Sequence, residues 1–346
     1  MNTTTSAIHI ESEGTYGCIF RPGITASGRP SAPGFITKIQ KDVDTVKNEW
    51  HISQLIRKIP GYLKYFSPIL QQYPVKMRPS VKNEIKKCGV FKNVSNQDLM
   101  MRTYVSNKIR YIGKGQELTE YVSTASKQQV FSTHQYLLDA IEQLVAHKLV
   151  HFDIKGNNII MDEKMEVPIL IDFGLSFCTA DLRPENYRSI FYVYDTYPYW
   201  PIETFLCNYI FQVVTYERSK TSTITEEDID MLIQGFIYGT DPQDVPSNYI
   251  FRVSDSPSLN EWAKHAKTWM LPWKNKTWWD LYSYLIPFHT TWDHYAVAVT
   301  YLFIVNDDSS WPKDDTYRSL LKKIVYSMPE KRPSMRDTSE EITRCM

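Results

Sequence analysis

Residues 151–174 read HFDIKGNNIIMDEKMEVPILIDFG, and this stretch decides the fold. Asp153, Lys155 and Asn158 follow directly after a helical pattern has ended, and Asp172 follows a short apolar run. This order predicts a polar loop, then a tight hairpin, then a second polar corner. Acidic, basic and amide side chains are therefore expected to gather at one place in the fold.

The two polar parts resemble the protein-kinase motifs H-x-D-x-K-x-x-N and D-F-G, in the same order along the chain. The resemblance implies an α+β, bilobal fold, with a small antiparallel β lobe that carries one main helix. A larger, mostly helical lobe would follow, and ATP would bind between the two. On this basis we expect an ATP-binding lobe at residues 1–105 and a catalytic and substrate lobe at 106–346.

The resemblance also implies a role for each polar residue. Asp153 would accept or orient the proton of the acceptor hydroxyl, and Lys155 would neutralise charge on the transferred phosphoryl group. Asn158 and Asp172 would ligate Mg²⁺, a hard cation that prefers oxygen ligands, with Mn²⁺ as an alternative metal. A lysine two residues after the catalytic aspartate is the pattern of serine/threonine kinases.

Residues 8–20, IHIESEGTYGCIF, predict a strand, a glycine turn and a second strand. The turn resembles the kinase glycine-rich loop, with a serine in place of the first glycine, and glycines there let backbone N–H groups approach phosphates. An ordinary hairpin turn is the alternative. The residues expected to contact the nucleotide are Ser12, Gly14, Thr15, Tyr16, Gly17 and Ile19.

Lys38 lies in the apolar strand pattern FITKIQK and is expected to hold the α- and β-phosphates, with Lys41 as the competing lysine. Residues 46–59 have helical periodicity, and Glu49 projects from the apolar face. A carboxylate on a buried face needs a partner. The resemblance implies an ion pair with Lys38, whereas a surface glutamate at a helix start is the alternative. Residues 99–105 are interpreted as a strand that runs into the hinge.

The segment DTYPYWPIE, residues 195–203, resembles the end of the kinase activation segment. The resemblance places Thr196 on the threonine that bridges the catalytic aspartate and lysine, and so among the catalytic residues. It pairs Glu203 with Arg332 in a buried clamp. It also implies that Asp293, at the start of an apolar helix, accepts hydrogen bonds from the backbone N–H groups of the loop at His151.

Phe152 departs from the family pattern, which has arginine at this position. That arginine binds the phosphorylated activation loop in regulated kinases, and phenylalanine cannot do so. We therefore expect activity that does not need phosphorylation of the activation segment.

Between Glu203 and Asp293 lie 89 residues, where most kinases have a short connection. This long connection contains helical patterns, and six of the nine tryptophans lie within it or at its end. Residues 204–291 are therefore expected to form a helical, Trp-rich insertion. It either packs on the large lobe or provides a docking surface for a substrate or partner.

The composition excludes several classes of protein. Charged residues make up 23% and hydrophobic residues 42%, which is not the composition of a disordered chain. Formal net charge is zero, so no nucleic-acid partner is expected. The longest apolar run, residues 295–305, is about half of a membrane span, and the N-terminal residues lack a signal pattern.

Five scattered cysteines are interpreted as reduced thiols of a cytoplasmic protein. The chain also resembles serine/threonine kinases of large nucleocytoplasmic DNA viruses. The features that carry this likeness are EGTYGCIF, the NEWHISQLIRKIP helix, YPYWPIE and the long insertion. That likeness implies the host cytoplasm, with the virion as a second location. We expect a monomer.

The sequence thus predicts a protein serine/threonine kinase that transfers the γ-phosphoryl group of ATP to protein substrates. Two alternatives stay open. A small-molecule kinase would share the first loop and the second metal aspartate, and a catalytically weak pseudokinase would act as a scaffold for partners.

Overall fold

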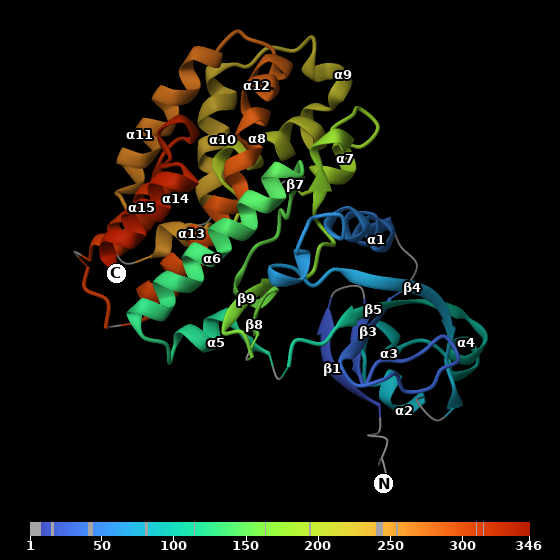
Figure 1. Ribbon diagram of the computed structural model, residues 1–346. Helices are drawn as coiled ribbons and strands as arrows, with labels where there is room; N and C mark the ends of the chain where they lie inside the picture. The colour runs from blue at the N-terminus through green and yellow to red at the C-terminus, as the bar shows by residue number, and fades with distance from the viewer. Residues whose placement is uncertain are drawn as a thin grey trace. The chain divides into compact units, whose positions relative to one another are not determined.

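The computed structural model describes residues 8–14, 17–40, 44–79, 82–113, 115–162, 164–193, 195–239, 245–253, 255–308, 310–313 and 315–346. The chain is mixed α/β and divides into two compact units (Figure 1). The first consists of Met1–Gln116 and Ile160–Ser176, and the second of Glu117–Ile159 and Phe177–Met346. The first unit therefore extends past the expected boundary at residue 105 and takes in the IDFG stretch.

An antiparallel sheet of five strands, in the order β1-β2-β3-β5-β4, organises the first unit. Its strands are β1 (His9–Gly14), β2 (Gly17–Arg21), β3 (Phe35–Gln40), β4 (Ile69–Lys76) and β5 (Thr103–Arg110). The hairpin expected at residues 8–20 is confirmed, since Gly14 pairs with Gly17 across β1 and β2. A Cβ atom at Gly17 would lie 2.2 Å from the carbonyl oxygen of Ile39, so strand packing alone requires glycine there.

The main helix of the first unit is α1 (Asp44–Ile56), which ends before Pro60-Gly61 as the sequence indicates. Its apolar face buries Val46, Ile52 and Ile56. Ser53, on the same face, accepts a hydrogen bond from the backbone N–H of Ile69 in β4, at 3.0 Å. The helix is thereby fixed against the sheet at a defined register.

Residues 82–101 lie between β4 and β5 in the sequence and are largely helical. They form three short helices, α2 (Lys82–Ile85), α3 (Gly89–Lys92) and α4 (Asn96–Met101). The strand interpretation of residues 99–105 is therefore wrong at its start, and β5 begins only at Thr103. The physical reason is a helix cap, because the Ser95 side chain accepts the N–H of Asp98 at 3.0 Å and turns the chain into α4.

The prediction of five reduced cysteines is wrong for two of them. Cys18 in β2 and Cys88, just before α3, form a disulfide with their Cα atoms 6.1 Å apart. Both are fully buried, and tertiary packing joins them across a sequence separation of 70 residues, so their spacing alone gave no signal. Cys178, Cys207 and Cys345 are free thiols. The cytoplasmic location stays a prediction.

Two helices position the polar loop of the second unit. α6 (Lys127–Ala146) begins at a capping box between Ser126 and Gln129 and leads into the short strand β7 (Leu149–Val150). α13 (Trp292–Asp307) buries most of its residues and packs against α6 and α14 (Thr316–Tyr326), which confirms the expected buried helix. β7 pairs with β10 (Phe177–Cys178), on the far side of the IDFG stretch in the sequence.

Short elements complete the two units. β8 (Ile159–Asp162) and β9 (Val167–Leu170) are neighbouring strands that form the hairpin between the two motifs. The remaining short strand and α-helices are β6 (Gln116–Glu117), α5 (Leu118–Val122), α7 (Tyr187–Ile190), α8 (Ile202–Tyr209), which runs into the insertion, and α15 (Met335–Cys345).

The insertion is helical, as expected. Its helices are α9 (Tyr216–Ser219), α10 (Glu226–Tyr238), α11 (Leu259–Met270) and α12 (Trp278–Leu285). Of the six tryptophans in or beside it, Trp262, Trp278 and Trp292 are buried and the other three are half-buried. The tryptophans therefore form interior packing rather than an open apolar face.

Among the described residues, no helix is both long enough and apolar enough to cross a lipid bilayer.

Candidate active site

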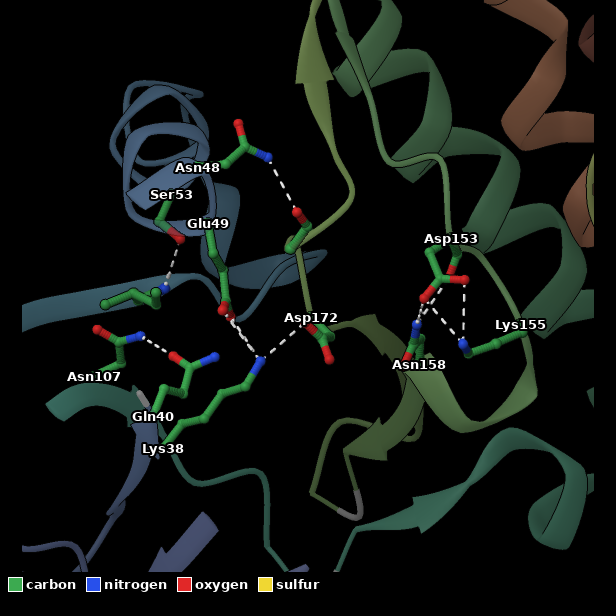
Figure 2. A network of polar contacts seen from close by, with 12 residues as sticks. Lys38, Gln40, Asn48, Glu49, Ser53, Asn107, Asp153, Lys155, Asn158 and Asp172 are labelled. Atoms are coloured by element: carbon green, nitrogen blue, oxygen red, sulfur yellow. Dashed lines mark hydrogen bonds and ion pairs between the residues drawn. The ribbon is translucent and has the colours of Figure 1, made fainter. Parts of the chain in front are cut away.

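In the first unit, Lys38 of β3 and Glu49 of α1 form a buried ion pair (Figure 2). The Nζ atom lies 3.1 and 3.3 Å from the two carboxylate oxygens, and the side chains are only 11% and 4% exposed. The predicted ion pair is therefore confirmed. The competing lysine, Lys41, lies outside the described residues.

Asp172 of the IDFG stretch contacts the same ammonium group, with Oδ1 at 3.1 Å from Lys38 Nζ. Its backbone has a φ of +59°, an uncommon conformation for a residue other than glycine. Asn48, beside Glu49 on α1, donates to the carbonyl oxygens of Gly174 and Ser176 at 3.1 and 2.8 Å. One helix thus holds both the lysine partner and the segment that carries Asp172.

These contacts keep Lys38 charged. Burial alone would lower the pKa of the Lys38 ammonium, but the carboxylates of Glu49 and Asp172 more than offset this and raise it. The two carboxylates fix the orientation of the ammonium group through charge-assisted hydrogen bonds.

The expected nucleotide-binding residues of the hairpin lie in register with Lys38. Ser12 in β1 pairs with Ile19 in β2, and Ile19 pairs with Lys38 in β3. Residues paired across antiparallel strands project from the same face, so the three side chains share one face of the sheet. Thr15 and Tyr16 lie outside the described residues.

In the second unit, Asp293 of α13 fixes the polar loop after β7. Its carboxylate accepts the backbone N–H groups of His151 and Phe152 at 2.7 and 2.9 Å, which confirms the predicted contact. Phe152 has a φ of +68°, a strained value for a bulky residue. The two hydrogen bonds stabilise this turn and so aim the next residue, Asp153.

The Asp153 carboxylate is the centre of a polar cluster (Figure 2). Lys155 Nζ lies 3.2 Å from Oδ1 and 3.0 Å from Oδ2. Asn158 Nδ2 donates to Oδ2 and to the backbone oxygen of Asp153, both at 2.8 Å. Because the Asn158 nitrogen is used in these two bonds, its amide oxygen is the atom that can serve as a metal ligand.

In the segment of residues 195–203, the side chain that contacts Asp153 is that of Tyr197, one position after the expected Thr196. The Tyr197 hydroxyl donates to Asp153 Oδ1 at 2.5 Å. The backbone N–H of Thr196 donates to the Asp195 side chain at 2.7 Å. Sequence reasoning missed Tyr197 because a single tyrosine in the aromatic stretch TYPYW carries no distinguishing signal.

Phe152 is buried in an aromatic cluster. Its ring stacks on Trp200 with centroids 4.7 Å apart and meets Phe177 edge-on at 5.3 Å. The Trp200 indole N–H donates to the Phe152 carbonyl oxygen at 2.8 Å. The segment that follows the IDFG stretch is therefore tied to the polar loop by apolar packing and a neutral hydrogen bond.

Glu203 of α8 and Arg332 form a bidentate pair, as expected. The distances are 2.7 Å from Nη1 to Oε1 and 3.2 Å from Nη2 to Oε2, and the side chains are 0% and 1% exposed. Arg332 also donates to the Thr291 hydroxyl at 2.7 Å. This pair joins the end of the activation segment to the C-terminal part of the second unit.

Comparison with known proteins gives a partial likeness. No protein-family model matches the chain. Over 70 residues it is 37% identical to the carbon catabolite-derepressing protein kinases of Candida glabrata and Saccharomyces cerevisiae. Each match covers 19% of this chain and 11% of the relative, so the matched region spans about a tenth of the length of those relatives. Part of the chain is therefore similar to protein kinases, which supports a kinase-like function.

Proposed function

We propose that this protein is an ATP-dependent protein serine/threonine kinase. The observation that carries the proposal is the Lys38 ammonium held between the carboxylates of Glu49 and Asp172. Kinase catalysis requires such a lysine–glutamate pair together with a metal-binding aspartate. The partial likeness to two protein kinases supports the same reading.

In this proposal the first unit binds the nucleotide. Lys38 pairs with the α- and β-phosphates, Ile19 packs on the adenine, and the hairpin at Gly14 and Gly17 covers the phosphates. Asp172 of the first unit would serve as a Mg²⁺ ligand, and the amide oxygen of Asn158 in the second unit is the other group that would do so. Carboxylate and amide oxygens are hard donors of the kind that Mg²⁺ prefers, so the residues fit the metal. Bound Mg²⁺ would neutralise phosphate charge.

The second unit supplies the groups for transfer. Asp153 accepts the proton of the substrate hydroxyl, and Lys155, which already contacts both carboxylate oxygens, neutralises charge on the transferred group. Lys155 is also the reason to propose serine or threonine as the acceptor, because the resemblance to serine/threonine kinases rests on it.

A substrate panel tests the proposal. Wild-type protein is incubated with Mg-ATP and, separately, with basic and acidic proteins, with an aminoglycoside and with choline, and Asp153→Asn is the inactive control. Phosphoserine or phosphothreonine in the proteins, absent with the control, is the expected result. Transfer to a small molecule alone would indicate a small-molecule kinase. Nucleotide binding without transfer to any acceptor would indicate a pseudokinase.

Activity is expected to be independent of phosphorylation. The Phe152–Trp200 stack and the Trp200 hydrogen bond hold the activation segment without a phosphate. Treatment with a broad-specificity phosphatase, verified by mass spectrometry, should therefore change the initial rate less than about twofold. Loss of activity that returns on rephosphorylation would contradict this expectation.

A further inference from the structure

The acceptor capacity of Oδ1 of the Asp153 carboxylate is fully used within the second unit. Oδ1 accepts the Tyr197 hydroxyl at 2.5 Å and Lys155 at 3.2 Å, whereas Oδ2 accepts Asn158 at 2.8 Å and lies 3.0 Å from the Lys155 ammonium group. Each carboxylate oxygen offers about two lone-pair positions. An incoming hydroxyl therefore has no position on Oδ1 unless one donor leaves.

Tyr197 is the donor that can leave at the lowest cost. Lys155 is charged and contacts both oxygens, and Asn158 is held by a second bond to the Asp153 backbone. Tyr197 is neutral, half-buried and bound to the carboxylate through one hydroxyl, and its ring packs against the rings of Trp200 at 5.1 Å and Tyr199 at 5.3 Å. Burial and the neighbouring Asp153 charge raise the pKa of Tyr197, so the phenol keeps its proton and stays a donor.

The backbone around Tyr197 is anchored independently of that hydroxyl. The backbone N–H of Trp200 donates to the Tyr197 carbonyl oxygen at 2.9 Å and closes a turn that contains Pro198. Trp200 is itself buried and fixed to Phe152. The tyrosine side chain can therefore rotate away from Asp153 while the turn stays in place.

We infer that Tyr197 is an internal competitor of the substrate hydroxyl, an autoinhibitory gate that the acceptor must displace before transfer. This inference rests on the proposed function. When the gate opens, the acceptor hydroxyl takes the Tyr197 position on Oδ1 and passes its proton to Asp153. Its oxygen forms a bond to the γ-phosphorus of ATP as the bond from that phosphorus to the bridging oxygen breaks, which releases ADP.

Tyr197→Phe tests the gate because it removes the hydroxyl and keeps the ring. A hydrogen bond to a charged group is strong enough that its loss should lower KM for a serine peptide about tenfold, without lowering kcat. ATP hydrolysis without peptide should rise by a similar factor, since water gains the same access. Tyr199→Phe is the matched control, because the Tyr199 ring packs against Phe303 and Tyr197 and is kept in phenylalanine, while its hydroxyl is not among the donors to Asp153 in the described residues. This control should leave both values unchanged.

A second measurement is independent of turnover. With 3-fluorotyrosine at position 197, the ¹⁹F resonance should move when Asp153 is replaced by asparagine. An unmoved resonance would overturn the contact, and a Tyr197→Phe protein with lower kcat would show a supporting residue instead of a gate. If no variant transfers phosphate while the resonance still moves, the proposed function fails and the gate with it. If wild type turns over and Tyr197→Phe gives no increase, only the gate fails.

Discussion

Asp153→Asn is expected to lower the rate of phosphoryl transfer by about 10²–10⁴, equivalent to about 3–5 kcal/mol of transition-state stabilisation. Asparagine has nearly the same shape but cannot take the proton of the acceptor. It also replaces one oxygen with a nitrogen that cannot accept from Lys155 or Asn158, which both donate to the carboxylate. The measurement is a single-turnover rate at saturating Mg-ATP.

Asp162→Asn is the matched control for this substitution. Asp162 is the last residue of β8, where its side chain accepts the N–H of Lys164 at 3.0 Å, and asparagine can accept the same bond. The control should retain the wild-type rate, and the affinity of Asp153→Asn for ADP, measured by calorimetry, should be close to that of wild type. A variant that keeps more than about a tenth of the rate would rule out Asp153 as the base.

Arg332→Met is expected to cost about 3–5 kcal/mol of unfolding free energy, because it leaves the fully buried Glu203 carboxylate without its partner. The Thr291 hydroxyl would also lose a hydrogen bond. The measurement is urea unfolding followed by tryptophan fluorescence. Arg336→Met is the matched control, since Arg336 pairs with Glu340 on an exposed face, and it should show no measurable loss.

The double variant Glu203→Leu with Arg332→Met separates the cost of a stranded charge from the value of the pair. Replacing both members removes the unpaired charge, so the double variant should recover much of the stability lost by Arg332→Met. If the double variant is instead as unstable as the sum of the two single variants, the pair is not an electrostatic clamp of the kind described.

The sequence predicted best those residues whose side-chain chemistry and place in a helical or motif pattern point to the same contact. Glu49 is a carboxylate on an apolar helix face, and such a group needs a buried cation, which Lys38 supplies. Asp293 and the Glu203–Arg332 pair were assigned through the kinase resemblance, and each makes the expected contact. Helical periodicity likewise located α1 within a few residues, and the apolar run at residues 295–305 lies within α13.

The features that the sequence did not reveal depend on tertiary packing or on a local cap. Cys18 and Cys88 meet because the buried core of the first unit brings them together, and neither has a neighbouring motif. The helix α4 depends on one serine cap that overrides an apolar run resembling a strand. The contact of Tyr197 depends on the turn that Trp200 closes, which motif spacing does not encode.

The Cys18–Cys88 disulfide also closes a covalent ring of chain, with a sequence separation of 70 residues. β3 and α1, and with them Lys38 and Glu49, lie inside this ring. Lys58, in the turn after α1, is exposed and is followed by Ile59, so it is a natural site for trypsin. A cut there would leave two fragments that migrate together until a reductant is added, so the strand pair around Lys38 would survive a break in the backbone.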